Sequence, residues 1–291
     1  MKVASQAGFI RKIDRDAFPM RLWQKAKRLG VWNPEEIDFS RDRQDWLSFT
    51  PEKREYILQL CAFFQAGEQA VTRELLPLIR VIGSQGRLEE EIYLSSFFFE
   101  EAKHVDLFSR FLSEVCEENG DLSCYLNPTY ESFIGDEFPR ALRRLNEDQS
   151  PEAQARAAGT YNIVVEGVLA ETGYYLFDRM LFEKKIFPGL AQAIGFLRRD
   201  ESRHIAFGIY LLSRLIDENG DGVRQAFIDR MSELAPIIEK ATRDFMDFFG
   251  REHAFGVSTE ELSRYAFLRF STRMRRILSA QERKNAQTVA Q

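Results

Sequence analysis

The sequence predicts an all-α protein: a four-helix bundle with additional flanking helices, built as a pseudo-twofold repeat of helix pairs. Apolar residues recur with a 3.6-residue period through long segments, and the 17 Gly and 9 Pro of 291 residues interrupt them rarely. The same boundary signals also return after 100 residues. Thr50 and Ser150 each precede a proline at a first helical position, and ENGD occurs at Glu118–Asp121 and again at Glu218–Asp221.

Four long helices follow from these signals, and they are expected to form the bundle as two antiparallel pairs. Their predicted ranges are 50–82, 87–118, 150–185 and 190–218. Gly83 should end the first helix. Gly120, in the first ENGD, should take a positive φ that ends the second helix.

Shorter helices are expected to flank the bundle. One is predicted over residues 130–146, and another over residues 223–249, with a kink at Pro236. A last helix should begin near Ser258, where Glu261 is placed to complete a capping box.

The two ends of the chain are predicted to differ in order. Residues 1–48 read as an ordered N-terminal arm with the aromatic anchors Phe18, Trp23, Trp32 and Trp46. Residues 280–291 read as a frayed tail. Since no linker composition interrupts the chain, residues 1–291 are expected to form a single domain.

Composition excludes several classes of function. Hydrophobic residues make up 44% of the chain, and acidic and basic residues are interleaved with a net charge of −5, so no nucleic-acid surface is expected. The N-terminus lacks a secretory pattern, and no apolar run is long enough for a membrane span. Cys61, Cys116 and Cys124 form no CxxC pair, which favours reduced thiols and a cytoplasmic protein.

The repeat carries one chemical pattern twice. Each copy supplies a helix with a glutamate and a helix with Glu-x-x-His, and the six residues are Glu68, Glu101, His104, Glu166, Glu201 and His204. Residues i and i+3 share a helix face, so each Glu-x-x-His pair can hold one ion. The neighbouring apolar residues turn these faces inward.

Four glutamates in a dry core would repel one another, whereas two divalent ions would balance their charge. Oxygen and imidazole donors without a cysteine favour iron and manganese. The competing interpretation is a pair of surface salt bridges repeated by duplication. The third histidine, His253, has no such context and is expected on the surface.

The acids beside these residues have two possible roles. Glu100 and Asp200 point about 100° away from the adjoining glutamates, so they are expected either to support the ligands or to be exposed. Asp106 and Glu171 could orient a ligand, but ordinary pairing with arginine is the favoured interpretation.

At these residues the chain resembles the ferritin-like superfamily. More closely, it resembles the small subunits of ribonucleotide reductases and their relatives, the ribonucleotide-reductase-small-subunit-like ligand-binding oxidases. The likeness runs from about Trp32 to the last helix. Carried over residue by residue, the family's metal ligands fall on the same six residues.

Three features favour the oxidase branch. Phe108 stands four residues after the first histidine, where a reductase small subunit carries a radical tyrosine. No aromatic residue follows Phe270, whereas reductase tails usually dock through aromatic residues. The positions of the oxidases' valine–tyrosine ether crosslink hold Val71 and Tyr161. Spacing places Val71 on the same helix face as the ligands. It places Tyr161 about 140° from Glu166, so the assignment of Tyr161 to the crosslink rests on the resemblance alone.

The resemblance implies an O₂-activating oxidase with a heterodinuclear Mn/Fe site, although Fe/Fe is possible. Such a protein performs two-electron C–H oxidation, forms the Val71–Tyr161 crosslink, binds a long-chain fatty acid or similar lipid and forms a homodimer. Glu68 and the first Glu-x-x-His would hold manganese, and Glu166 and the second would hold iron. The 25 phenylalanines could line a channel for the lipid tail.

Three alternatives remain at the level of sequence. One is a Mn/Fe ribonucleotide reductase small subunit that lacks the radical tyrosine. The second is iron storage in a ferritin-like shell. The third is an arylamine or acyl-chain oxygenase with the same ligands.

Overall fold

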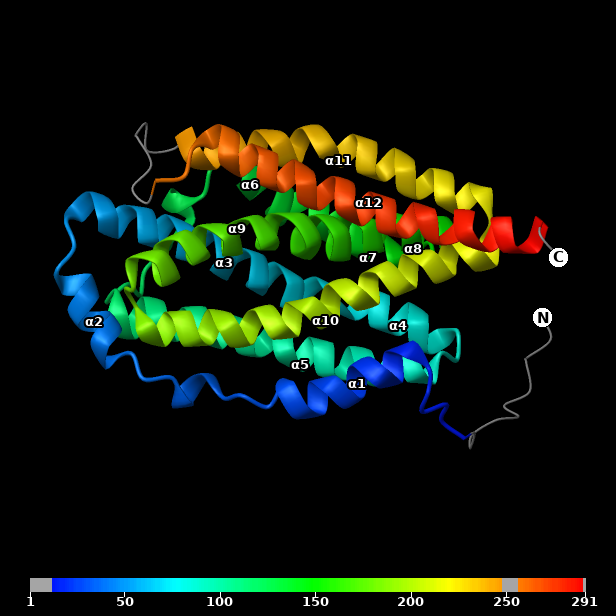
Figure 1. Cartoon of the computed structure of the whole chain (residues 1–291), viewed down its shortest axis with the longest axis horizontal. Coiled ribbons are helices and arrows are strands. Elements are labelled where there is room, and N and C mark those ends of the chain that lie inside the picture. Colours follow the sequence, from blue (N-terminus) through cyan, green and yellow to red (C-terminus); the bar gives the residue numbers. More distant parts are fainter. Residues whose placement is uncertain (1–11, 248–255, 290–291) are drawn as a thin grey trace.

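The computed structural model describes residues 12–247 and 256–289, and the side chains of residues up to 279. Within these ranges all regular elements are helical. Figure 1 shows the long helices running side by side along the molecule, with α11 and α12 at one edge and α1 at the other. His253 lies outside the described residues, so its expected exposure stays a prediction.

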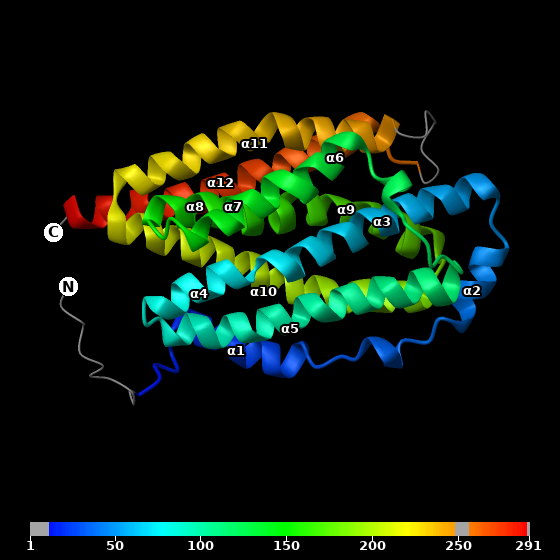
Figure 2. The ribbon, with the colours of Figure 1, turned by 180° about the vertical axis from the view of Figure 1, so that it is seen from behind.

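Four segments correspond to the predicted bundle helices. The first is α3 (Pro51–Glu74) with α4 (Leu76–Ser84), and the second is α5 (Leu88–Arg110) with the π-helical turn η2 (Phe111–Val115). The third comprises α8 (Pro151–Ala158), the π-helical segment η6 (Gly159–Ala170), α9 (Glu171–Phe177) and the π-helical turn η7 (Asp178–Phe182). The fourth is α10 (Pro188–Asn219). Figure 2 shows α3 and α5 side by side, and both bury apolar faces toward the middle of the bundle.

The first predicted helix is divided in two. α3 ends at Glu74, and α4 begins at Leu76 with Pro77 in its first turn. Proline has no amide hydrogen to donate to the carbonyl of Arg73, so one regular helix cannot pass unbroken through this position.

The predicted end of the second helix is wrong in its detail. The π-helical turn η2 ends at Val115, and the residue with positive φ is Glu117 (φ 57°) rather than Gly120. The Cys116 amide donates to the Phe111 carbonyl at 3.3 Å, so the wider turn ends the helix before Gly120 is reached. At the second ENGD the predicted end of the helix is confirmed, because α10 ends at Asn219 and is followed by Gly220, which has φ 80°.

The flanking helices occur where they are predicted. Residues 130–146 lie in α6 (Pro128–Ser132), the π-helical turn η4 (Phe133–Glu137), α7 (Phe138–Arg143) and the 3₁₀ turn η5 (Arg144–Asn146). α11 (Asp221–Asp247) remains one helix through Pro236. α12 (Thr259–Val289) includes residues 280–289, so the backbone is helical where a frayed tail is expected. Residues 280–289 contain helix-favouring Ala, Gln, Glu, Arg and Lys, which explains the difference.

The start of α12 shows half of the predicted capping box. The Ser258 hydroxyl accepts a 3.1 Å hydrogen bond from the Glu261 amide. The Glu261 carboxylate instead accepts a hydrogen bond from the Tyr175 hydroxyl, which ties α12 to α9.

The described part of the N-terminal arm contains α1 (Phe18–Leu29), the 3₁₀ turn η1 (Pro34–Glu36) and α2 (Ser40–Leu47). Its aromatic anchors pack as expected: Phe18 stacks on Tyr210 of α10 at 5.3 Å, and Trp46 is buried. The Asp42 carboxylate accepts hydrogen bonds from the Gly189 and Leu190 amides, so the arm caps the helix that carries half of the candidate site. Among the described helices, none is long and apolar enough to cross a membrane.

Candidate metal centre

The six residues of the repeated pattern meet in the middle of the bundle, and all are buried. α3 supplies Glu68, α5 supplies Glu101 and His104, η6 supplies Glu166, and α10 supplies Glu201 and His204. This arrangement contradicts the interpretation of these residues as surface salt bridges.

The donor atoms form two groups whose members lie within 4.8 Å of one another, and Glu101 belongs to both. One group adds Glu68, His104 and Glu201, and the other adds Glu166 and His204. The sequence pattern pairs Glu201 with the second ion, yet its Oε1 lies 3.3 Å from His104 Nδ1 and 3.7 Å from His204 Nδ1. Two carboxylates, Glu101 and Glu201, therefore lie between the histidines.

Both histidines direct Nδ1 into the centre, and acids behind them contact Nε2. His104 Nε2 lies 3.5 Å from Asp200 Oδ2, and His204 Nε2 lies 2.9 Å from Glu100 Oε2. The Arg203 guanidinium joins these two acids, at 2.6 Å from Glu100 Oε1 and in contact with Asp200. Glu100 and Asp200 are thus buried supports of the histidines and not exposed groups.

The other two acids have ordinary roles. Asp106 is exposed, and Glu171 contacts Arg269 and Arg273 of α12. The arginine pairing favoured for Glu171 is confirmed.

Several inward-facing atoms fit a metal pair. Among the buried side-chain atoms without a hydrogen-bond partner in the described residues, four belong to the six donors: His104 Nδ1, His204 Nδ1, Glu166 Oε1 and Glu201 Oε2. Unpaired buried polar atoms are costly, and these four belong to residues of the two donor groups. Cations held by carboxylate and imidazole donors would satisfy all four, and this donor set suits iron or manganese.

Without metal, protons must stabilise this cluster. Burial raises the pKa of Glu68 to about 8, against the opposing effect of His104. Burial and the charge of Glu201 raise the pKa of Glu166 well above its usual range. Burial also opposes the charged forms of Glu101 and the histidines, but their mutual contacts hold the pKa of Glu101 low and those of His104 and His204 high.

These directions predict how stability depends on pH. Glu68 and Glu166 have raised folded-state pKa values, so from about pH 5 to 8 the unfolded chain loses protons that the folded chain keeps. The raised pKa values of the histidines act in the same direction above about pH 6.5. The Tm of the metal-free protein should therefore fall between pH 6 and 8, while the increase in Tm on adding metal should grow. Differential scanning calorimetry of both forms measures this, and a Tm of the metal-free protein that rises over this range would contradict it.

The support behind the second histidine can be tested directly. Glu100→Gln removes the negative charge that orients His204, so metal affinity should fall by about 10- to 100-fold while the fold persists. Competition with a chromophoric chelator measures the affinity. Glu114→Gln, a surface acid of η2, is the matched control and should bind metal as the unaltered protein does.

The structure brings Tyr161 to the site, which helical spacing does not predict. Its hydroxyl donates a 3.3 Å hydrogen bond to Glu101 Oε1, and its side chain is fully buried. Tyr161 lies in η6, where hydrogen bonds join residues i and i+5. Tyr161 and Glu166 are five residues apart, so the π-helical segment places them on nearly one face. Val71 is buried in the same apolar cluster as Tyr161.

Sequence reasoning missed several polar neighbours. Asn162 Nδ2 donates to Glu166 Oε2 at 3.2 Å, an i,i+4 pair that spacing could have found. Burial raises the pKa of the Tyr174 hydroxyl, and the negative charges of Glu201 and Glu68 raise it further. No local sequence signal indicates Tyr174. Phe108 packs in an aromatic cluster with Phe64 and Phe177, so its position carries a hydrocarbon ring without a hydroxyl.

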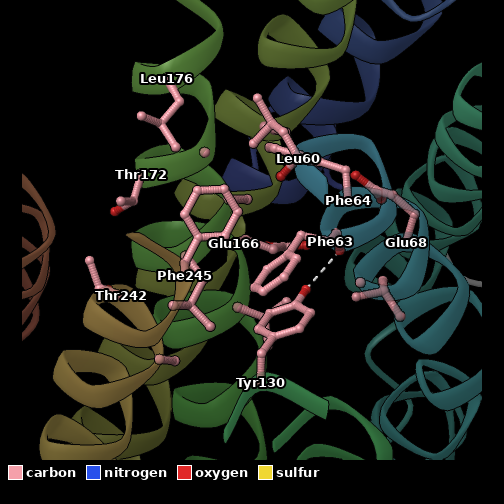
Figure 3. Close-up of a pocket in the computed structure, with 18 of the residues that line it drawn as sticks. Leu60, Phe63, Phe64, Glu68, Tyr130, Glu166, Thr172, Leu176, Thr242 and Phe245 are labelled. Carbon is pink, nitrogen blue, oxygen red and sulfur yellow. Dashed lines mark hydrogen bonds between the residues drawn. The ribbon is translucent and has the colours of Figure 1, made fainter. Parts of the chain in front are cut away.

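An apolar cavity extends from the carboxylates toward α11 and α12 (Figure 3). Glu68 and Glu166 are among its lining residues, together with Thr242 and Phe245 of α11. The Tyr130 hydroxyl closes one wall by donating to the Phe63 carbonyl at 2.9 Å. The space between its lining atoms is about 760 Å³ when the opening to solvent is included.

Comparison with known proteins agrees with this geometry. The family described as "Ribonucleotide reductase, small chain" matches residues 16–277. An R2-like ligand-binding oxidase with aerobically reconstituted Mn/Fe cofactor is 40% identical, with a TM-score of 0.87, over 91% of this chain and 94% of that chain. A valine-to-leucine variant of such an oxidase with anaerobically reconstituted Mn/Fe cofactor is 40% identical, with a TM-score of 0.85, over 91% and 95%.

The family match covers most of the chain, and the similar structures share its helical bundle across nearly their whole length. Their Mn/Fe cofactors correspond to a buried carboxylate and histidine cluster in this chain. The protein belongs to the ribonucleotide reductase small-chain family, within it to the R2-like ligand-binding oxidases, and is a ferritin-like oxidoreductase.

Proposed function

We propose that this protein is an O₂-activating Mn/Fe oxidase that performs two-electron C–H oxidation, forms a Val71–Tyr161 ether crosslink and binds a long-chain fatty acid or similar lipid. One observation carries the proposal. Two buried donor groups share Glu101, and the same carboxylate accepts a hydrogen bond from the Tyr161 hydroxyl beside an apolar cavity.

The six buried donors are the proposed metal ligands: Glu68, Glu101, His104, Glu166, Glu201 and His204. Glu101 would bridge the two ions, and the position of Glu201 between the histidines makes it a second candidate bridge. When bound, the metal pair supplies the redox chemistry that reduces O₂. Glu100 and Asp200 would keep both imidazoles oriented toward the ions.

Tyr161 and Val71 are the proposed sites of internal oxidation. The Tyr161 hydroxyl donates to Glu101, so this carboxylate orients the phenolic oxygen beside the proposed metal pair. Crosslinking joins the phenolic oxygen to a Val71 carbon. One O–H and one C–H bond break, and two protons and two electrons pass to O₂. Burial of both side chains keeps bulk water away from this step.

The cavity suits an amphiphile with an acidic head. Its wall includes the four glutamates of the proposed metal site, where oxidised ions would carry more positive charge than these carboxylates balance. A fatty-acid carboxylate would add negative charge there. The tail would lie among Leu60, Phe63, Phe245 and the other apolar side chains of the wall.

Reconstitution tests the function as a whole. The metal-free protein is loaded with Mn²⁺ and Fe²⁺ without O₂ and then exposed to air. Anomalous scattering at both metal edges should show two ions among the six donors, and O₂ uptake should follow loading. Two iron ions would revise the metal assignment to Fe/Fe, whereas retention of neither metal would overturn the oxidase.

The lipid ligand can be tested separately. Ala241→Phe places a ring in the cavity from α11, so co-purifying fatty acid should fall at least about fivefold because the tail loses its space. Extraction and mass spectrometry measure the bound lipid. Ser232→Phe, on the exposed side of the same helix, is the control. Equal lipid content in both variants would argue against this cavity.

The assembly and location of the protein complete the proposal. A homodimer is expected, and sedimentation would distinguish it from the large shell of an iron-storage protein. All three cysteines lie in the described residues and are free thiols, which suits a cytoplasmic protein.

A further inference from the structure

Lys103 lies behind the metal centre, next to His104, and its ammonium group stands over the indole ring of Trp32. Nζ is 4.3 Å from the ring centroid and donates a 2.7 Å hydrogen bond to the Gly30 carbonyl. It also lies 3.4 Å from Asp200 Oδ2. The side chain is only 8% exposed, so water screens this charge poorly.

Trp32 is connected to the metal centre by short contacts. Its Nε1 donates a 2.8 Å hydrogen bond to Asp200 Oδ2, and the same oxygen lies 3.5 Å from His104 Nε2. The indole also stacks on the His104 ring at 6.2 Å. The indole also stacks on Phe196 at 5.7 Å, and Arg199 lies over that phenylalanine.

This connection creates a possible side reaction. An oxidant strong enough to remove hydrogen from Val71 could also take an electron from an indole ring. In that side reaction Trp32 would lose one electron to the metal pair that O₂ has oxidised, which is reduced by one electron. The Nε1 proton would stay on the indole, hydrogen-bonded to Asp200, so the oxidised ring would carry a positive charge. Each such event removes oxidising power from the Val71–Tyr161 reaction.

A fixed positive charge opposes this loss. A cation at the face of a neutral indole is attracted to its π electrons, but it repels the positive ring that one-electron oxidation creates. We infer that Lys103 is a positioning residue that protects Trp32 from oxidation and so directs the oxidising equivalents toward Val71 and Tyr161. The second half of this inference rests on the proposed function, whereas the protection of Trp32 can be measured without it.

The first experiment uses the zinc-loaded protein, because zinc is redox-inert. Trp23→Phe and Trp46→Phe leave Trp32 as the one tryptophan of the three in the chain. Transient absorption follows its oxidation by an external photo-oxidant. Lys103→Gln, which keeps a donor for Gly30, should increase the oxidation rate at least about fivefold, and Lys103→Arg, which keeps the charge, should change it less than about twofold. Equal rates in the two variants would overturn the inference.

The second experiment uses protein loaded with Mn²⁺ and Fe²⁺ and exposed to O₂. Lys103→Gln should show a transient tryptophan radical by electron paramagnetic resonance and at least about a twofold loss of crosslink. Adding Trp32→Phe should remove the radical and restore the crosslink, which a purely structural defect would not allow. Failure of this rescue would overturn the directing role. Absence of any crosslink in the unaltered protein would instead count against the proposed function, and the zinc experiment would still decide whether Lys103 protects Trp32.

Discussion

Glu101→Ala should reduce bound metal from about two ions per chain to less than one and abolish O₂ uptake, because Glu101 is the residue common to both donor groups. Its Oε1 lies 3.0 Å from His204 Nδ1, and its Oε2 lies 3.7 Å from His104 Nδ1. Removing Glu101 takes one donor from each group. Each ion would then be held by fewer donors and balanced by less negative charge. Metal analysis after desalting measures the stoichiometry.

A matched control separates loss of metal from loss of fold. Asp106→Ala removes an exposed acid from the same helix and should retain both ions. Far-UV circular dichroism should show helical spectra for both variants. If Glu101→Ala still bound two ions, Glu101 could not be the shared ligand.

Tyr161→Phe should abolish the internal crosslink while leaving both metal ions bound. The substitution removes the phenolic oxygen that the ether needs, but it leaves all six proposed ligands in place. After aerobic loading, the unaltered protein should lose the mass of two hydrogen atoms relative to the metal-free chain, and the variant should lose none. Intact-mass measurement followed by peptide mapping would locate the link at Val71 and Tyr161.

Tyr130→Phe is the control for this experiment. Tyr130 also lines the region of the cavity, but its hydroxyl donates to the Phe63 carbonyl and not to a glutamate of the metal centre. This variant should form the crosslink as the unaltered protein does. An unchanged mass in the unaltered protein after O₂ exposure would rule out the crosslink itself.

The sequence predicts the bundle and the meeting of six donors because both depend on regular helical periodicity. Glu101 and His104 share a face by i,i+3 spacing, and α5 keeps that regularity through the site. Apolar neighbours along the same helix indicate which way the face points. The 100-residue repeat then identifies Glu201 and His204 as the equivalent pair on α10.

Features that depend on departures from this periodicity could not be predicted from spacing. Tyr161 lies 140° from Glu166 on an ideal α-helix, but η6 is π-helical and brings the two together. The contacts of Trp32 with Asp200 join residues 168 positions apart, so they depend on how the arm packs. The left-handed residue Glu117 likewise follows from a π-helical turn that residue propensities do not indicate.

The π-helical segment η6 also makes the two halves of the 100-residue repeat inequivalent. Glu68 projects from a regular α-helix, whereas Glu166 projects from a wider coil in which Asn162 contacts its carboxylate. Two identical metal-binding sites would give no structural basis for placing one divalent metal in one site and a different metal in the other. Here the local backbone geometry differs between the two proposed metal positions, so they would present different surroundings to a bound ion.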